Sequence, residues 1–131
     1  MPRKMHWSDR YVGLPYIAGA GDCAALAAKV ARDVLGIDCG LPASHATGVR
    51  EQSAQVMANK DALAVRIDAP IDAQPALFLA RGRLAHIGVV CIIGGEVWVL
   101  HADQSAGAVV RERLSRMTEF RYILEGFYKW L

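Results

Sequence analysis

Apolar residues in the first third of the chain recur with helical spacing. Over residues 24–35, leucine and valine return every three to four positions, and most charged residues fall on the other side of the helix. Asp22 is a suitable N-cap, which places Cys23 at the first helical position, and Gly36 is a suitable C-terminal stop. A second amphipathic helix is expected over residues 47–60.

The second half has the composition of β-strands. Short apolar, β-branched runs predict strands at 76–80, 85–93, 96–101, 108–112 and 122–128, whereas 61–67 is ambiguous between a helix end and a strand. The pair Gly94-Gly95 predicts a two-residue hairpin in which Ile93 faces Glu96. Helices followed by strands predict an α+β domain, with N-terminal helices packed on one face of an antiparallel β-sheet.

Composition narrows the class of protein. The 131 residues are 53% hydrophobic and 21% charged, which predicts one globular domain over residues 1–131. A net charge of +2 without a basic run gives no support to nucleic-acid binding. Three cysteines, an odd number, argue against a disulfide framework. Pro15 and Asp22 interrupt what superficially resembles a signal, so we expect cytoplasmic synthesis without a signal peptide and no membrane insertion.

Cys23 carries the strongest chemical signal. At a helix N-terminus, unpaired N–H groups and the positive end of the helix dipole favour the thiolate, which is a nucleophile. The alternative is a structural cysteine in a core helix. A zinc site made of Cys23, His86 and His101 is a further alternative, but the helix start already accounts for the thiol and the spacings match no zinc motif. The residues themselves therefore give little support to zinc.

The predicted hairpin supplies partners for this thiol. Because strand side chains alternate, His86 and His101 share one face as diagonal neighbours, and Gly88 opposite His101 leaves room for a ring. Two imidazoles in this register suit a base and the group that orients it. Asp103 is the alternative third group. The other two histidines are expected at the surface: His6 and His45.

Several motifs occur in an order that is typical of one enzyme family. Residues 11–16 (Tyr-Val-Gly-Leu-Pro-Tyr) lead into Gly-Asp-Cys at 21–23, followed by Ala-His-Ile-Gly-Val at 85–89 and Val-Leu-His-Ala at 99–102. This chain resembles the NlpC-type papain-like cysteine peptidases, in particular their phage-tail and small cell-wall hydrolase members. The segments 107–113 and 125–128 look most like the phage-tail members.

The resemblance implies a papain-like fold and a cysteine peptidase that cuts murein stem peptides. It makes Cys23 the nucleophile, His86 the general base and acid, and His101 the group that orients His86. The backbone N–H of Cys23 would help form the oxyanion hole, and Tyr16 and Asp22 would belong to oxyanion and substrate binding. The resemblance implies no metal or organic cofactor. Phage-tail proteins are the expected partners, and the tail, acting at the cell wall, is an expected location.

Departures from the family pattern leave the substrate open. Many members carry a tryptophan where this chain has Ala18, and serine-glycine or tryptophan-glycine where it has Ala24 and Ala25. Two other functions are compatible with the sequence. One is a phage-tail structural or assembly protein with little turnover, and the other is a thiol amidase or acyl transferase acting on another amide or ester.

Overall fold

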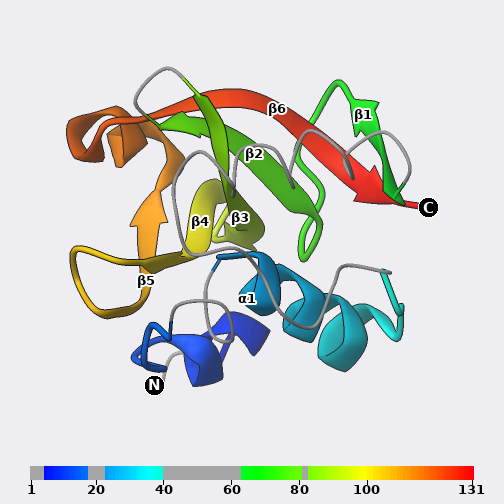
Figure 1. The fold of residues 1–131 in the computed structure, drawn as a ribbon. Coiled ribbons are helices and arrows are strands. Elements are labelled where there is room, and N and C mark those ends of the chain that lie inside the picture. The colour runs from blue at the N-terminus through cyan, green and yellow to red at the C-terminus, as the bar shows by residue number, and fades with distance from the viewer. Residues whose placement is uncertain (1–4, 18–22, 40–62, 81–82) are drawn as a thin grey trace.

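One antiparallel sheet of six strands organises the molecule, in the order β1-β6-β2-β3-β4-β5 (Figure 1). The computed structural model describes residues 5–17, 23–39, 63–80 and 83–131. The strands are β1 (Ala64–Ile67), β2 (Pro75–Ala80), β3 (Arg83–Ile93), β4 (Glu96–Asp103), β5 (Ala108–Arg113) and β6 (Tyr122–Trp130). Each expected strand is present, and the ambiguous segment forms β1. The α+β class is therefore confirmed.

Short helices flank the sheet. They are the 3-10 helices η1 (Trp7–Tyr11) and η3 (Leu114–Phe120), the α-helix α1 (Cys23–Val30) and the π-helical turn η2 (Ala31–Leu35). The helix expected over 24–35 is thus α-helical only in its first part. Gly36 ends it in the left-handed conformation, with φ 69°, as the sequence predicts. The second expected helix, over 47–60, lies outside the described residues.

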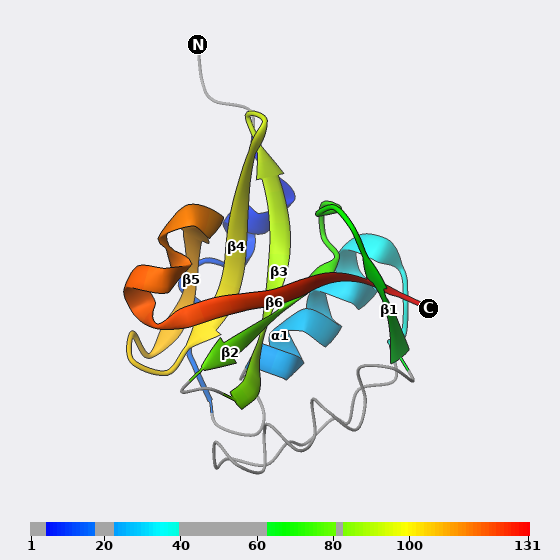
Figure 2. The same ribbon diagram turned by 90° about the horizontal axis from the view of Figure 1, so that it is seen from above.

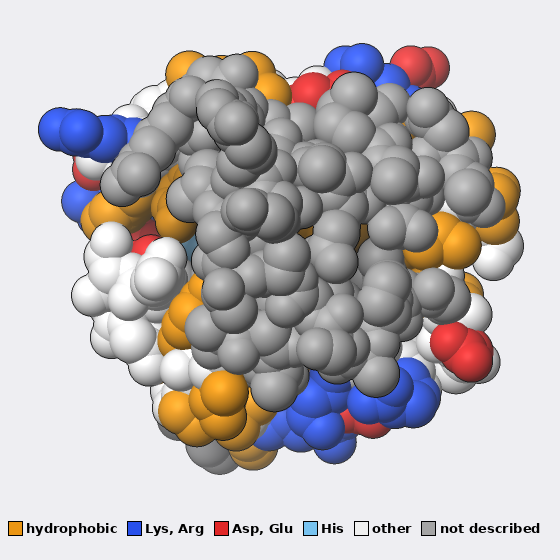
Figure 3. All heavy atoms as spheres, in the orientation of Figure 1, with side chains coloured by type: hydrophobic (Ala, Val, Ile, Leu, Met, Phe, Trp, Pro, Cys, Tyr) orange, Lys and Arg blue, Asp and Glu red, His pale blue; other side chains and the backbone are white. Residues whose placement is uncertain are grey.

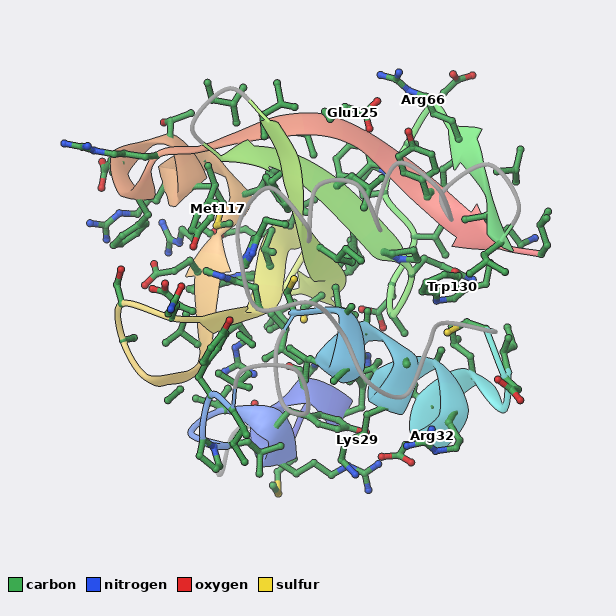
Figure 4. The ribbon with its side chains drawn as sticks, viewed as in Figure 1. Lys29, Arg32, Arg66, Met117, Glu125 and Trp130 are labelled. Atoms are coloured by element: carbon green, nitrogen blue, oxygen red, sulfur yellow. The ribbon has the colours of Figure 1, made fainter. Side chains whose placement is uncertain are left out.

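The two faces of the sheet bury two separate apolar clusters. α1 packs on β3 and β4 and closes the first cluster, which includes Leu26, Val30, Val89 and Leu100. In Figures 1 and 2 this helix lies across one face of the sheet. On the other face, Met117 of η3 points into the second cluster (Figure 4). Alternate residues of the central strands therefore belong to different cores.

The β3–β4 hairpin has the predicted register. Ile93 pairs with Glu96, and Gly94 and Gly95 adopt φ 59° and 80°, as a two-residue turn with both φ positive requires. The regular pairing continues to Val89 and Leu100. The histidines on this hairpin consequently reach the end of the sheet opposite its tip.

Register shifts between β2 and both of its neighbouring strands determine which side chains meet at the end of the sheet opposite the hairpin tip. The register of β2 shifts against β3 after Phe78, and against β6 just before it. Phe78 thereby pairs with His86, and Ala80 pairs with Tyr122. Pro75 begins β2 opposite Val89.

The N-terminal segment is attached along β5. Backbone hydrogen bonds join Gly13 to Val109 at 2.9 Å and Tyr16 to Gly107 at 2.9 Å, so Tyr16 lies at the beginning of β5. Among the described helices, none has the length and apolar character that crossing a membrane requires.

A polar network holds η1 against the sheet. Arg111 of β5 donates to Ser8 Oγ at 2.7 Å and to Asp9 Oδ1 at 2.5 Å. His6 Nδ1 lies 2.7 Å from the same Ser8 oxygen, and His6 Nε2 lies 3.4 Å from Asp72 Oδ1. With 16% of its side chain exposed, His6 is partly buried rather than fully at the surface. His45 lies outside the described residues.

Candidate active site

Cys23 is the first residue of α1 and is buried in the first cluster. Figure 2 shows α1 starting near the end of the sheet where β3 begins and β4 ends. His86 lies near the beginning of β3 and His101 near the end of β4, so all three predicted catalytic residues belong to this end of the molecule. Asp22, the predicted cap and substrate-binding residue, lies outside the described residues.

The two histidines form a buried, hydrogen-bonded pair. His86 Nε2 lies 3.0 Å from His101 Nδ1, and the two rings are nearly perpendicular, at 87°. Only 6% of His86 and 1% of His101 is exposed. The sequence prediction that these side chains share one face of the hairpin is confirmed. Gly88, expected to make room for a ring, borders Val99 and the ring of Phe78.

Tyr122 is a member of this cluster that the sequence did not predict. Its ring stacks on His86 with centroids 4.2 Å apart and planes 16° apart. It also meets His101 edge to face at 5.4 Å. Tyr122 is the first residue of β6 and reaches the histidines because of the register shifts around β2. A single sequence gives no signal for those shifts, so only its place in an expected strand could be foreseen.

Asp103, the alternative third group, contacts the site through Tyr122. The Tyr122 hydroxyl donates to Asp103 Oδ1 at 3.4 Å, and the same oxygen accepts the Ser105 N–H at 3.2 Å. The side chain bonded to His86 is His101. His101, not Asp103, is therefore the side chain that contacts His86, and the negative charge of Asp103 acts on His101.

Burial keeps both imidazoles neutral at pH 7. It lowers the pKa of His86 to about 3, and the charge of His101 lowers it further. The pKa of His101 falls to about 4 for the same reason, although the negative charge of Asp103 opposes the shift. A neutral imidazole carries one N–H and one bare nitrogen, so one ring must donate to the other across the 3.0 Å contact.

The hydrogen bond defines two possible tautomer pairs. If His86 donates from Nε2, its Nδ1 is bare and can accept a thiol proton, as a general base must. His101 then carries its own proton on Nε2, which has no hydrogen-bond partner among the described residues. In the opposite pair His86 Nδ1 bears the proton and cannot accept another. The base-competent arrangement therefore leaves one buried N–H of His101 without a partner in the described part of the chain.

Cys23 and Tyr16 both lie close enough to Tyr122 to act on its ionisation. Burial raises the pKa of Tyr122, Asp103 raises it next, and the negative forms of Cys23 and Tyr16 raise it further. Tyr122 thus contacts the histidine pair, and its ionisation is also affected by Cys23 and Tyr16. The phenol stays protonated and can donate to Asp103.

An open pocket of about 350 Å³ lies elsewhere, lined by Met5, His6, Trp7, Arg10, Asp33 and Val34. It contains none of the candidate catalytic residues. Its charges are already paired, since Asp33 lies 3.6 Å from Arg10 and 3.5 Å from Lys29. Lys29 and Arg32 lie on the lower edge of the view in Figure 4, where Figure 3 shows Lys and Arg side chains gathered. The candidate site is the histidine pair, which lies outside this pocket.

Metal binding has no support in the described residues, where no three His, Cys, Asp or Glu side chains are grouped to hold an ion.

No family model, curated protein or solved structure matches the chain.

Proposed function

We propose that this chain is a cysteine peptidase with an NlpC-type papain-like fold that hydrolyses amide bonds in murein stem peptides. The observation that carries the proposal is the buried pair of neutral histidines, bonded at 3.0 Å, at the end of the sheet near which α1 begins with Cys23. A thiol, a base and an orienting group are the parts that cysteine hydrolases need. The family resemblance of the motifs supports murein peptides as the substrate.

In this mechanism the Cys23 thiol gives its proton to His86 Nδ1 while the sulfur attacks the carbonyl carbon of the scissile amide. His86 Nε2–H donates to His101 Nδ1, which fixes the ring and stabilises the imidazolium. His86 Nδ1 then gives the proton that it took from the thiol to the amide nitrogen. The C–N bond breaks, and a thioester remains on Cys23. Water attacks the thioester with His86 as base, which releases the acid and restores the thiol.

The low pKa of His86 is compatible with this role. The value of about 3 describes the resting site, in which burial disfavours a charged ring. As the proton moves, a thiolate appears beside the imidazolium, and attraction between the opposite charges raises the affinity of His86 for the proton. Proton transfer is thereby coupled to attack on the substrate.

Digestion of purified murein tests the proposal, with released fragments identified by mass spectrometry. The native protein is expected to release stem-peptide fragments, and Cys23→Ala is expected to release none. Cys91→Ala is the matched control, because Cys91 is a buried cysteine on β3 whose pKa burial raises to about 12. His86→Ala should slow release at least about 100-fold. Fragments from Cys23→Ala would end the proposal.

A structural role in a phage tail is the second candidate, and burial favours it. Cys23, His86 and His101 are 7%, 6% and 1% exposed. Under this reading Cys23 is alkylated as slowly as Cys91, and tails assemble normally with Cys23→Ser. Alkylation of Cys23 much faster than that of Cys91 would favour the peptidase.

A further inference from the structure

We propose that Tyr122 is a positioning residue of this site. Its ring, stacked on His86, holds the imidazole with Nε2 toward His101. The inference rests on the proposed function and assigns a role to a side chain that lies outside the cysteine and histidine motifs.

The need for such a contact follows from the geometry of histidine. The torsion that turns an imidazole about its Cβ–Cγ bond is soft and broadly two-fold, so the side chain itself does not select which nitrogen faces the thiol. His86 is restrained instead by its neighbours. Tyr122 covers its face at 4.2 Å and 16°, and His101 meets it at 87°. Turning the ring out of this plane would drive its edge into Tyr122.

Tyr122 is itself held at both ends. Its backbone begins β6 opposite Ala80, directly after Arg121, which takes φ 67° and ends η3. Its hydroxyl donates to Asp103 Oδ1 at 3.4 Å. The ring that supports His86 is therefore fixed through its backbone and through its hydroxyl.

The stacked ring also favours the charged form of His86. The face of an aromatic ring attracts a cation, and the attraction is stronger where water is excluded. When His86 takes the thiol proton, the imidazolium forms against this face. Removing the ring should therefore reduce the population of the thiolate–imidazolium pair.

The test is the pH dependence of Cys23 alkylation by iodoacetamide between pH 5 and 9, with the modified peptide identified by mass spectrometry. The native protein should show a plateau of reactivity below the ordinary thiol pKa, and His86→Ala should remove it. Tyr122→Leu should lower this plateau about tenfold, equivalent to about 1.4 kcal/mol, and leave the rate at pH 9 unchanged. Tyr122→Phe keeps the ring and should restore most of the plateau.

Phe127→Leu is the matched control. Phe127 lies on the same strand and packs against the same cluster as Tyr122, but it is not among the rings that contact His86 in the described structure. It should keep the native profile. A purely structural role for Tyr122 predicts that both leucine variants lose stability while both retain the plateau, and that result would overturn the inference.

Two failures can be distinguished. If the native plateau depends on His86 but a folded Tyr122→Leu retains it, only the role of Tyr122 is lost. If native Cys23 titrates as an ordinary thiol and His86→Ala changes nothing, the proposed function fails and the inference fails with it. Should Tyr122→Leu not fold, NMR of the native protein decides. The stacked ring predicts upfield-shifted imidazole C–H signals for His86, and unshifted signals would overturn the inference.

Discussion

Gly88, on the same strand as His86, leaves space for the side chains of Val99 and Phe78. A Cβ at this position would overlap Val99 Cγ1 and lie 3.0 Å from Phe78 Cε2, both in the second buried cluster. Because neither neighbour can move freely, Gly88→Ala should lower the free energy of unfolding by about 1–3 kcal/mol. Urea denaturation measures this loss.

Gly126→Ala provides the comparison for that substitution. Its added Cβ would meet Arg66 Nε at 2.8 Å, the far end of an exposed side chain that can shift. Arg66 is paired with Glu125 at the surface, at 3.0 Å (Figure 4), and such pairs contribute little. The expected cost is below about 1 kcal/mol. Equal losses for the two variants would show that space around Gly88 is not limiting.

The buried histidines should make the protein sensitive to mild acid. Their pKa values in the fold, about 3 for His86 and about 4 for His101, lie below the ordinary 6.5. Between pH 6.5 and pH 5 the unfolded chain binds protons that the folded chain does not, so stability falls as the pH falls. The expected loss is about 1.5 kcal/mol for each histidine over this interval.

Urea unfolding at several pH values between 6.5 and 5 checks this expectation. His101→Asn removes one of the two titrating groups and should remove about half of the dependence. The change in the free energy of unfolding with pH thus reports how many buried histidines are neutral in the fold. A native stability that does not change over this interval would mean that the pair is not held neutral in the fold.

Among the elements, η1 depends on one charged residue of β5. Arg111 donates to Ser8 and Asp9, and the Arg111 and Asp9 side chains are 16% and 18% exposed. Arg111→Ala leaves Asp9 largely buried without this partner and should cost about 3 kcal/mol. Arg116→Ala breaks a pair with Glu119 in which both side chains are more than half exposed, so its cost should be below about 1 kcal/mol. Thermal and urea denaturation of both variants separate the two cases, and similar losses would contradict the buried-pair argument.

Local pattern was sufficient to predict most elements. Helical spacing located α1, Gly36 located the end of the helical segment after η2, and Gly94-Gly95 located the hairpin and its register. The π-helical turn η2 and the strand β1 were not predictable in the same way. β1 has four residues, and its identity depends on pairing with β6 rather than on its own sequence.

The site was predictable only where local rules determine it. Alternation along one hairpin placed His86 and His101 on the same face, because the turn fixes their register. Tyr122 comes from a strand that is distant in sequence, and its contact with His86 depends on the shifts around β2. These register shifts arise from tertiary packing, so the sequence pattern of β6 alone does not predict them.

At the scale of the whole molecule, both buried clusters share the same strands. Neighbouring residues such as Val89 and Val90 alternate between the first and the second cluster, so neither cluster can open while the sheet remains intact. The N-terminal segment is tied into the same unit. Asp72 accepts hydrogen bonds from the Trp7 indole at 2.8 Å and from the Ile92 backbone of β3 at 2.8 Å.

This connectivity predicts one cooperative unfolding transition. Urea unfolding followed by far-UV circular dichroism reports the sheet, and the fluorescence of a variant carrying Trp98→Phe and Trp130→Phe reports Trp7 alone. Both signals should change at the same midpoint. Releasing Trp7 requires breaking its hydrogen bond to Asp72, which also bonds β3, and the hydrogen bond between Arg111 and η1. A Trp7 transition at lower urea would show that η1 detaches before the sheet unfolds. In that case Arg111→Ala should shift the Trp7 transition further and leave the midpoint of the sheet nearly unchanged.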